Sequence, residues 1–261
     1  MREHDLFGHY NPDHFAIENL EISKFPMGDI LLNGVQVYYA LFEISLASSL
    51  AQLPPSVHPS VPGMAGIMFW RIADSPWGPF SFAQIGIACR TGIKPRHLVV
   101  DCFASSPAAV NYLRHRHGFA VSLADVNLQE NYDRVIGTVS LRGEKILEVE
   151  TRALTPIIGG NAFIKISPAL NAVAGTDGPE LLQFDASYEF ERVVRGTPRV
   201  TVFESPKISR PNLVLQTPVS GAYAVADITI HDPRYLLPSH KPVERVGVRK
   251  LTPVAAKAAR A

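Results

Sequence analysis

The chain has 261 residues, of which 46% are hydrophobic and 19% are charged, so it can bury a core and has too few charges for a disordered or coiled-coil protein. Twenty-five Lys and Arg against 24 Asp and Glu give a formal net charge of +1, which provides no long-range field for a nucleic acid or an acidic membrane. The charged residues Glu3, His4 and Asp5 argue against a signal peptide, and a cytoplasmic protein without nucleic-acid or membrane partners is predicted.

Short strands dominate the sequence, because 21 prolines and 18 glycines divide it into segments that alternate β-branched and aromatic residues with polar ones. A first, short helix is predicted after Ser45, which can cap it. Leu46, Leu50 and Leu53 follow at helical spacing, and Pro54 ends the run.

The best-defined helix lies between Ser106 and Gly118. Ser106 suits the N-cap, Pro107 the first helical position and Gly118 the C-cap. Its last turn carries the four cationic residues 114–117, which the negative end of the helix dipole stabilises. Spacing favours a solvated helix end over a functional cluster, because four consecutive residues cannot all face one pocket.

A hairpin is predicted where two alternating runs, 135–141 and 145–153, flank Arg142-Gly143-Glu144. Gly143 can supply the positive φ that a tight turn requires. Further strands are predicted at 162–167, 181–188, 199–203 and 223–230.

Domain boundaries and cofactor motifs are absent from the sequence. No repeat or low-complexity linker divides the chain, so one domain is expected at 1–245 and a flexible tail at 246–261. Cys89 and Cys102 form no CxxC pair, the histidines show no ligand spacing, and no glycine-rich phosphate loop is present. No metal and no cofactor are therefore predicted.

Several segments share their order and spacing with one known family: 25–28, 78–80, 84–88, 161–168 and 220–227. Together they resemble the acetoacetate decarboxylase superfamily over residues 25–238. The resemblance implies a mainly β (β-rich α+β) fold, an antiparallel β cone or barrel with a flanking sheet and a few short helices. Such a barrel encloses a cavity with an apolar lining.

Residues 108–124, AAVNYLRHRHGFAVSLA, are similar without a gap to the family's AAxxxGREVWGFPKKLA, and Arg114 matches the family's arginine. The family's Pro-Lys-Lys is Ala120-Val121-Ser122 in this chain, so valine stands where the family has its Schiff-base lysine. The family's pocket glutamate falls at Gln84, and its glutamate after the helix arginine falls at His115. Because valine cannot form an imine, the resemblance implies a member without Schiff-base decarboxylation.

The resemblance predicts an enzyme of lyase, cyclase or dehydratase type that acts on a small carbonyl or polyketide-like compound by non-covalent acid–base chemistry. Gln84 is expected to donate to a carbonyl or enolate oxygen, Arg114 to clamp a carboxylate or enolate, and His115 to move a proton. Ser122 and Tyr223 are further catalytic candidates. An aromatic-rich stretch from Trp70 to Phe82 could line a pocket or belong to ordinary core. The expected substrate-binding residues are Phe69, Trp70, Phe80, Phe82, Phe119 and Val121.

Two other functions stay open at this point. The chain could be a non-catalytic module that binds a small molecule on the same fold. It could also be a decarboxylase with a relocated lysine, for which Lys165 is the only candidate in a predicted core strand, although such lysines more often extend to the surface. A homo-oligomer is possible, because exposed edge strands often pair between subunits.

Overall fold

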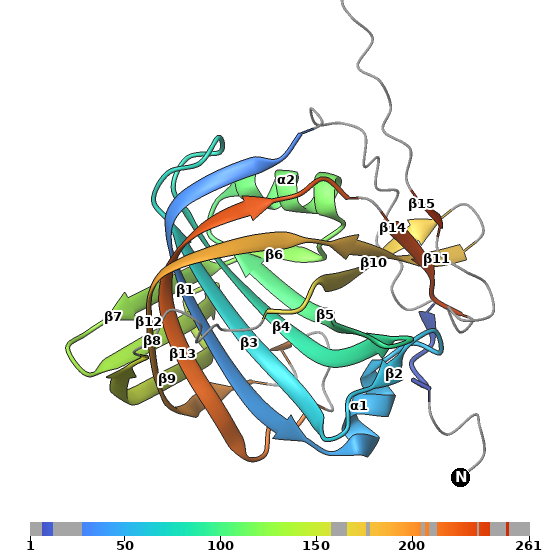
Figure 1. Ribbon diagram of the computed structural model, residues 1–261, viewed down its shortest axis with the longest axis horizontal. Helices are drawn as coiled ribbons and strands as arrows, with labels where there is room; N and C mark the ends of the chain where they lie inside the picture. The colour runs from blue at the N-terminus through green and yellow to red at the C-terminus, as the bar shows by residue number, and fades with distance from the viewer. Residues whose placement is uncertain are drawn as a thin grey trace, which may run out of the picture.

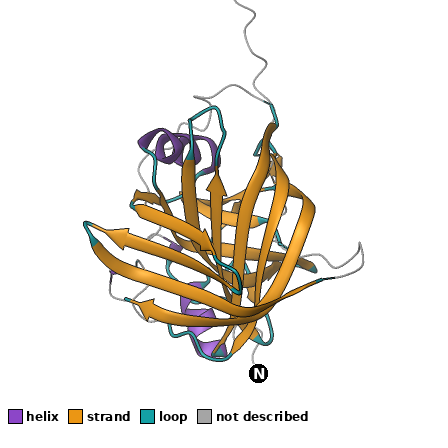
Figure 2. Cartoon of the chain, turned by 90° about the vertical axis from the view of Figure 1, so that its left-hand side faces the viewer, coloured by secondary structure: helices purple, strands orange, loops and turns teal. Residues whose placement is uncertain are grey.

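In the part of the chain that the structure describes, one curved sheet of 15 strands predominates, and two helices lie at its opposite ends (Figure 1, Figure 2). The computed structural model describes residues 7–12, 28–157, 166–175, 178–204, 207–208, 213–233, 235–240 and 249–250. The helices are α1 (Leu46–Gln52) and α2 (Pro107–His117). The strands are β1 (Ile30–Ile44), β2 (His58–Pro59), β3 (Gly63–Ile72), β4 (Phe80–Thr91), β5 (Lys94–Ala104), β6 (Val121–Leu123), β7 (Asp125–Glu130), β8 (Arg134–Leu141), β9 (Glu144–Pro156), β10 (Ala169–Gly175), β11 (Gly178–Phe184), β12 (Ala186–Phe203), β13 (Pro218–Ile230), β14 (Tyr235–Pro238) and β15 (Arg249–Lys250).

The sheet is open. Its order is β15-β14-β11-β10-β5-β4-β3-β1-β13-β12-β9-β8-β7, with β2 paired to β4 and β6 paired to β5. All pairs are antiparallel except β10 with β5 and β5 with β6. Within the described residues, β7 and β15 each have one neighbour, so the closed barrel expected from the resemblance is wrong. The physical reason is that β7 packs across β3, β4 and β5 and does not pair with the far edge.

Alternation along the strands divides the buried side chains between two cores. The hairpin-side core lies on the face covered by β7, β8 and β9, and Tyr38 and Phe69 belong to it. The helix-side core lies on the opposite face beneath α2, and Val37 and Trp70 belong to it. Neighbouring residues of one strand thus enter different cores, because successive side chains of a strand point to opposite faces.

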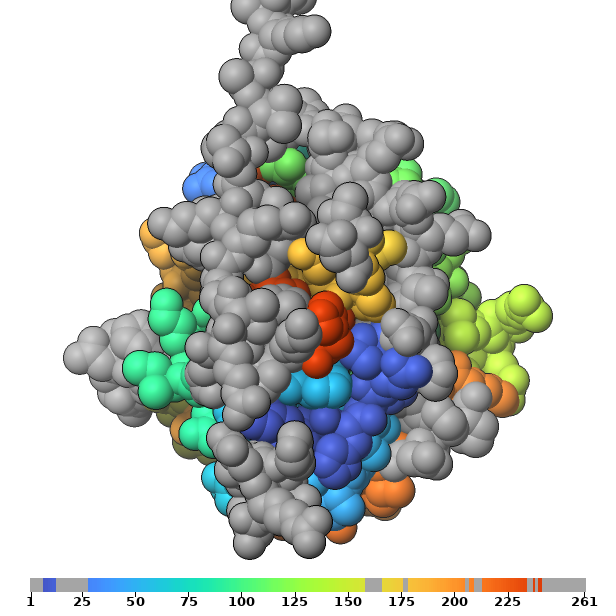
Figure 3. Space-filling model, turned by 90° about the vertical axis from the view of Figure 1, so that its right-hand side faces the viewer, coloured from blue at the N-terminus to red at the C-terminus, as the bar shows by residue number. Residues whose placement is uncertain are grey.

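Both predicted helices are confirmed. The side chain of Ser45 caps α1 by accepting from Ser48 N at 3.0 Å. Residues 7–12 lie against this helix (Figure 3), where His9 N donates to Leu50 O at 2.8 Å. Gly118 ends α2 in the left-handed conformation with φ 68, whereas Ser106 occupies the N-cap without a side-chain capping bond.

The predicted hairpin is also confirmed, as β8 and β9. Its turn has positive φ at Arg142 (52°) and Gly143 (82°), which matches the right-handed twist of the flanking strands. The strand predicted at 181–188 is interrupted at Asp185, where β11 ends and β12 follows.

One other predicted strand belongs to a longer one, and two further predictions are only partly covered by the structure. The segment predicted at 199–203 is the end of the much longer β12. Of the strand predicted at 162–167, residues 162–165 lie outside the described residues. Within the predicted flexible tail, Arg249–Lys250 form β15 against β14, and 246–248 and 251–261 lie outside the described residues.

Candidate functional site

Three strands carry a lateral row of side chains into the helix-side core. Gln84 of β4 pairs with Cys102 of β5, and Cys102 pairs with Val121 of β6. Laterally paired residues share a face, and neighbouring strands lie about 4.8 Å apart, so Gln84 and Val121 lie on one face at a separation of about 10 Å. The positions that the resemblance assigns to the pocket glutamate and to the Schiff-base lysine are therefore brought together.

A pocket lies beside Gln84 on this face. It is lined by β3, β4, β5, the segment 166–169, the end of β11 and the beginning of β12. Most of its roughly 230 Å³ of space is open to solvent, and the enclosed part, about 10 Å³, has room for about one water molecule. From the part of the chain that the structure describes, no Asp, Glu, Lys or Arg lines it. The lining residues are Met68, Gln84, His97, Ile166, Ser167, Pro168, Ala169, Phe184, Ala186 and Tyr188.

Gln84 and His97 form the central polar contact of the pocket, with 3.1 Å between Gln84 Nε2 and His97 Nε2. Gln84 is 3% exposed. The imidazole lies across the backbone of Gly86, where a Cβ atom would come within 2.5 Å of His97 Cδ2. Because residue 86 is a glycine, the imidazole can pack directly on the backbone of β4.

Enclosure of the His97 ring lowers its pKa to about 4, and a hydrogen bond to the backbone of Ser167 opposes this shift. A hydrogen bond to the backbone raises a histidine pKa when the ring donates to a carbonyl oxygen, so His97 is the donor in its bond to Ser167. Because the Gln84 amide nitrogen can only donate, His97 Nε2 accepts from it and the ring proton resides on Nδ1. His97 is thus a neutral imidazole near pH 7.

Two tyrosines lie near this pair. Tyr188 lines the pocket and packs edge-on against Trp70, with 6.2 Å between ring centroids. The side chain of Tyr39 lies over Gly66, where a Cβ atom would come within 2.5 Å of the Tyr39 hydroxyl oxygen. Burial raises the pKa of Tyr39 to about 12 and that of Tyr188 well above its ordinary value. Both phenols therefore keep their protons and can donate hydrogen bonds.

The other predicted catalytic residues lie elsewhere. Arg114 is exposed, and its Nη2 donates to the carbonyl oxygen of Val121 at 3.0 Å, so it holds β6 against α2. His115 is half-buried on the same helix, and Ser122 is exposed on β6. None of these three side chains is among the residues that line the described pocket.

Tyr223 lies on the opposite face of the sheet, in the hairpin-side core. Arg192 lies over its ring at 5.4 Å from the centroid, and Arg192 also forms an ion pair with Glu130. Burial is the main cause that raises the pKa of Tyr223 to about 12. Phe69 belongs to the same core. The sheet thus separates Tyr223 and Phe69 from Gln84.

The remaining predicted substrate-binding residues share the helix-side core with the pocket. Trp70 lies 6.4 Å from the pocket residue Phe184, and Phe82 packs on Phe119 at 5.4 Å, both between ring centroids. These rings form the wall behind the pocket and do not line it. The residues of the predicted set in this core are Trp70, Phe80, Phe82, Phe119 and Val121.

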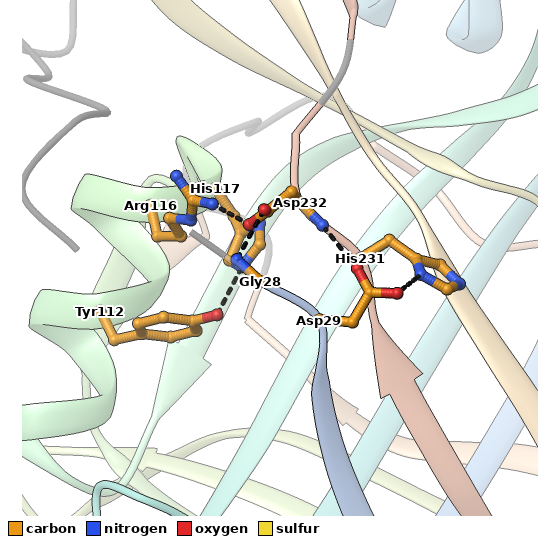
Figure 4. Close-up of polar contacts among 7 residues, drawn as sticks. All are labelled: Gly28, Asp29, Tyr112, Arg116, His117, His231 and Asp232. Carbon is orange, nitrogen blue, oxygen red and sulfur yellow. Dashed lines mark hydrogen bonds and ion pairs between the residues drawn. The ribbon is translucent and has the colours of Figure 1, made fainter. Parts of the chain in front are cut away.

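The last turn of α2 is joined to the residues that flank β1 and β13 (Figure 4). Arg116 is 3% exposed and forms an ion pair with Asp232, whose carboxylate also accepts from Gly28 N at 2.7 Å. His117 is 1% exposed, and its Nε2 lies 2.9 Å from the Tyr112 hydroxyl. Burial lowers the pKa of His117 to about 3. The predicted solvated helix end is therefore wrong for Arg116 and His117.

A second polar chain lies on the outer side of β12. His231 Nδ1 is 2.7 Å from Asp29 Oδ2, and His231 Nε2 is 2.7 Å from Ser187 Oγ. This is the order of contacts in a serine hydrolase triad, but such a triad uses a buried carboxylate, and the Asp29 side chain is 55% exposed. Ser187 also lies within a paired stretch, opposite Thr229. We assign this chain a structural role in joining β1, β12 and β13.

Sequence reasoning missed two site residues, His97 and Tyr188. His97 has no motif of its own, and its neighbours in sequence, Lys94-Pro95-Arg96, suggest a turn. The available signal was Gly86, a small residue inside a predicted core strand, which often marks a close approach by another group. Lys165, the candidate for a relocated Schiff-base lysine, lies outside the described residues.

The fold is that of acetoacetate-decarboxylase-like proteins. The acetoacetate decarboxylase from Legionella pneumophila is similar with TM-score 0.67 and 17% identity, over 81% of this chain and 88% of that chain. The enduracididine biosynthesis enzyme MppR complexed with pyruvate gives TM-score 0.68 and 14% identity, over 83% and 93%. An acetoacetate decarboxylase-like enzyme from Sphingomonas wittichii RW1 gives 0.62 and 13%, over 80% and 93%. At these identities the likeness shows the fold.

The sequence shows to which family the chain belongs. The family model described as acetoacetate decarboxylase matches residues 23–238, which is more than half of the chain. This protein therefore belongs to the acetoacetate decarboxylase family. No curated protein sequence is significantly similar to it. Among the described residues, no helix is long and apolar enough to cross a membrane.

Proposed function

We propose that this protein is an enzyme of lyase, cyclase or dehydratase type that acts on a small carbonyl compound without forming a Schiff base. The observation that carries the proposal is the Gln84–His97 pair, in which Gln84 is buried and His97 half-buried; both line a pocket on the face that Val121 shares. Valine has no nucleophile, and the neutral Gln84 stands where the family has a glutamate, beside the neutral His97. Such groups can bind a carbonyl or enol and guide proton transfer.

The roles within the pocket follow from the donors and acceptors. Tyr188 donates to the carbonyl oxygen, since its phenol stays protonated. Gln84 contacts the other polar end of the substrate, and His97 holds the amide of Gln84 in place. Arg114 is a positioning residue, because it reaches the backbone of β6 and not the pocket.

Borohydride trapping tests the absence of covalent chemistry. The folded protein is incubated with acetoacetate or pyruvate, reduced with borohydride and weighed intact by mass spectrometry. We expect no adduct, because an imine requires a neutral amine within the pocket. A stoichiometric adduct would overturn the proposal and point to a relocated lysine, which peptide mapping would locate at Lys165 or another position.

A non-catalytic binding module is the second candidate function. It is favoured by the low basicity of His97, since a group with a pKa of about 4 is a weak proton acceptor near neutral pH. Proton NMR of small carbonyl compounds incubated with the protein separates the two functions. An enzyme converts one of them, and the His97→Gln variant loses that conversion; a module broadens the ligand signals and leaves the compound unchanged.

We further propose that the protein acts in the cytoplasm as a homo-oligomer. The nearly balanced charge and the one-sided pairing of β7 support these two points. Size-exclusion chromatography with light scattering measures the mass in solution, and a single 28.6 kDa species would exclude the oligomer.

A further inference from the structure

The amide of Gln84 has a defined orientation. Its Nε2 donates to His97 Nε2, because the other ring nitrogen of His97 carries the proton and is turned to the backbone of Ser167. A flipped amide would place Gln84 Oε1 against the lone pair of His97 Nε2, which is repulsive. The oxygen of the amide is therefore the atom left for other contacts.

Gln84 Oε1 is buried and has no hydrogen-bond partner among the described residues. A buried acceptor without a partner lowers stability by about 1–3 kcal/mol, so such an atom in a pocket indicates a donor that arrives with a ligand. An acceptor selects a hydroxyl or N–H group. It does not bind a ketone oxygen, which is the role that the sequence predicted for Gln84.

The described lining of the pocket holds no fixed charge. His97 is neutral above a pH of about 4, and Gln84 stands where the family has a glutamate. An ionised carboxylate offers only acceptor atoms, so it cannot donate to Gln84 Oε1 and is repelled by it. Tyr188, by contrast, offers a donor to an uncharged carbonyl oxygen.

We infer that the pocket selects a neutral hydroxy-carbonyl compound and discriminates against keto acids. The hydroxyl group donates to Gln84 Oε1, and the carbonyl oxygen accepts from Tyr188. This inference rests on the proposed function for the identity of the site, but it concerns binding and requires no turnover.

Three ligands of nearly equal size test the inference. 4-Hydroxy-2-butanone carries both groups, 2-pentanone replaces the hydroxyl by a methyl group, and acetoacetate replaces the terminal CH2OH group by a carboxylate. Isothermal titration calorimetry on the unmodified chain measures each affinity. We expect the hydroxy ketone to bind at least about 10-fold more tightly than either of the others, which is the discrimination expected from one buried hydrogen bond.

Gln84→Met is the matched variant, because methionine has a similar shape and no amide oxygen. We expect it to weaken the hydroxy ketone to the level of 2-pentanone and to leave 2-pentanone unchanged. Trp70 packs on two lining residues, so its fluorescence in a Trp77→Phe variant reports the same binding independently.

Tightest binding of acetoacetate, equal binding of the hydroxy ketone and 2-pentanone, or no binding of any of the three overturns the inference. Its failure is distinguishable from failure of the proposed function. Preference for the hydroxy ketone without conversion of any compound keeps the inference and excludes the enzyme. A borohydride adduct with acetoacetate excludes the proposed non-covalent chemistry whatever the order of affinities.

Discussion

Individual side chains in this protein take their chemistry from burial. His97 and His117 belong to different parts of the helix-side region, yet the environment keeps both imidazoles neutral. Gln84 shows the same effect in another form, since one bond to His97 leaves its amide oxygen to a ligand. Composition could not reveal these states, because they depend on neighbours that are distant in sequence.

Acid should destabilise the protein through these two histidines. Their folded pKa values of about 4 and about 3 lie below the ordinary value of 6.5, so between these limits the unfolded chain binds protons that the folded chain excludes. The contribution of these histidines to the free energy of unfolding is therefore fully present above pH 6.5. It falls as the pH is lowered towards 3, by on the order of 8 kcal/mol in total, since the two pKa differences together span about six pKa units of about 1.4 kcal/mol each. Urea denaturation at pH 8, 6, 5 and 4 measures the loss.

A matched pair of variants assigns this pH dependence. His117→Asn should flatten the decline, whereas His240→Gln, at an exposed position, should leave it unchanged. A midpoint of denaturation that stays constant from pH 8 to pH 4 would contradict the assigned protonation states.

Gly86→Ala should disturb the site through a single methyl group. A Cβ atom at this position lies 2.5 Å from His97 Cδ2, so the ring must move away from Gln84. We expect a loss of about 1–3 kcal/mol in unfolding free energy, the usual cost of overpacking, together with weaker ligand binding. Repeating the substitution in a His97→Ala background forms a double-mutant cycle. If the loss persists there, the imidazole is not the group that requires this glycine.

At the scale of elements, α2 is held by its last turn. Arg116 crosses to Asp232 beyond β13, and Arg114 reaches the backbone of β6. The helix therefore connects strands that are not neighbours in the sheet, and it covers the core in which the pocket lies.

Asp232→Ala should lower the unfolding free energy by about 1.5–3 kcal/mol, because it removes an ion-pair partner of the buried Arg116 and the carboxylate that accepts from Gly28 N. Glu144→Ala removes the ion pair between the exposed side chains of Glu144 and Lys207. This variant should lower the unfolding free energy by less than about 1 kcal/mol. Urea denaturation compares the two. Equal effects of the two single variants would show that the buried ion pair contributes no more to stability than the exposed one.

The short strand β6 carries the position at which the family has its reactive lysine. Val121→Lys places an amine in an apolar core about 10 Å from Gln84, where burial should depress its pKa. We expect this variant to give a borohydride-trapped adduct with 4-hydroxy-2-butanone, the kind of neutral ketone that the pocket is inferred to select, whereas the parent protein gives none. Ser122→Lys, with the new side chain on the exposed neighbouring position, is the control and should give none. An adduct on both variants would mean that the position within β6 does not matter.

The whole molecule is one open sheet with a different core on each face. Residues that the resemblance groups together are divided by this arrangement: Gln84, Trp70 and Val121 belong to the helix-side face, whereas Phe69 and Tyr223 belong to the other. The sheet also leaves two end strands, β7 and β15, where a closed barrel was expected.

Local signals were sufficient for much of this protein. The two helices, the turn at Arg142 and Gly143, and the β-rich character follow from capping residues, glycine and alternation, all of which act over a few neighbouring residues. The family resemblance, carried by short motifs, is confirmed, and the strand that contains Gln84 was placed correctly.

Only the tertiary structure brought Gln84, His97 and Tyr188 together, and only it separated Tyr223 from them. These relations depend on strand register, on the open curvature of the sheet and on glycines such as Gly86 that admit a ring. A shift of one residue in any strand would exchange its two faces, and a short sequence window does not contain that information. The fold class thus follows from the local sequence pattern, whereas the set of residues that meet at the site depends on long-range strand pairing.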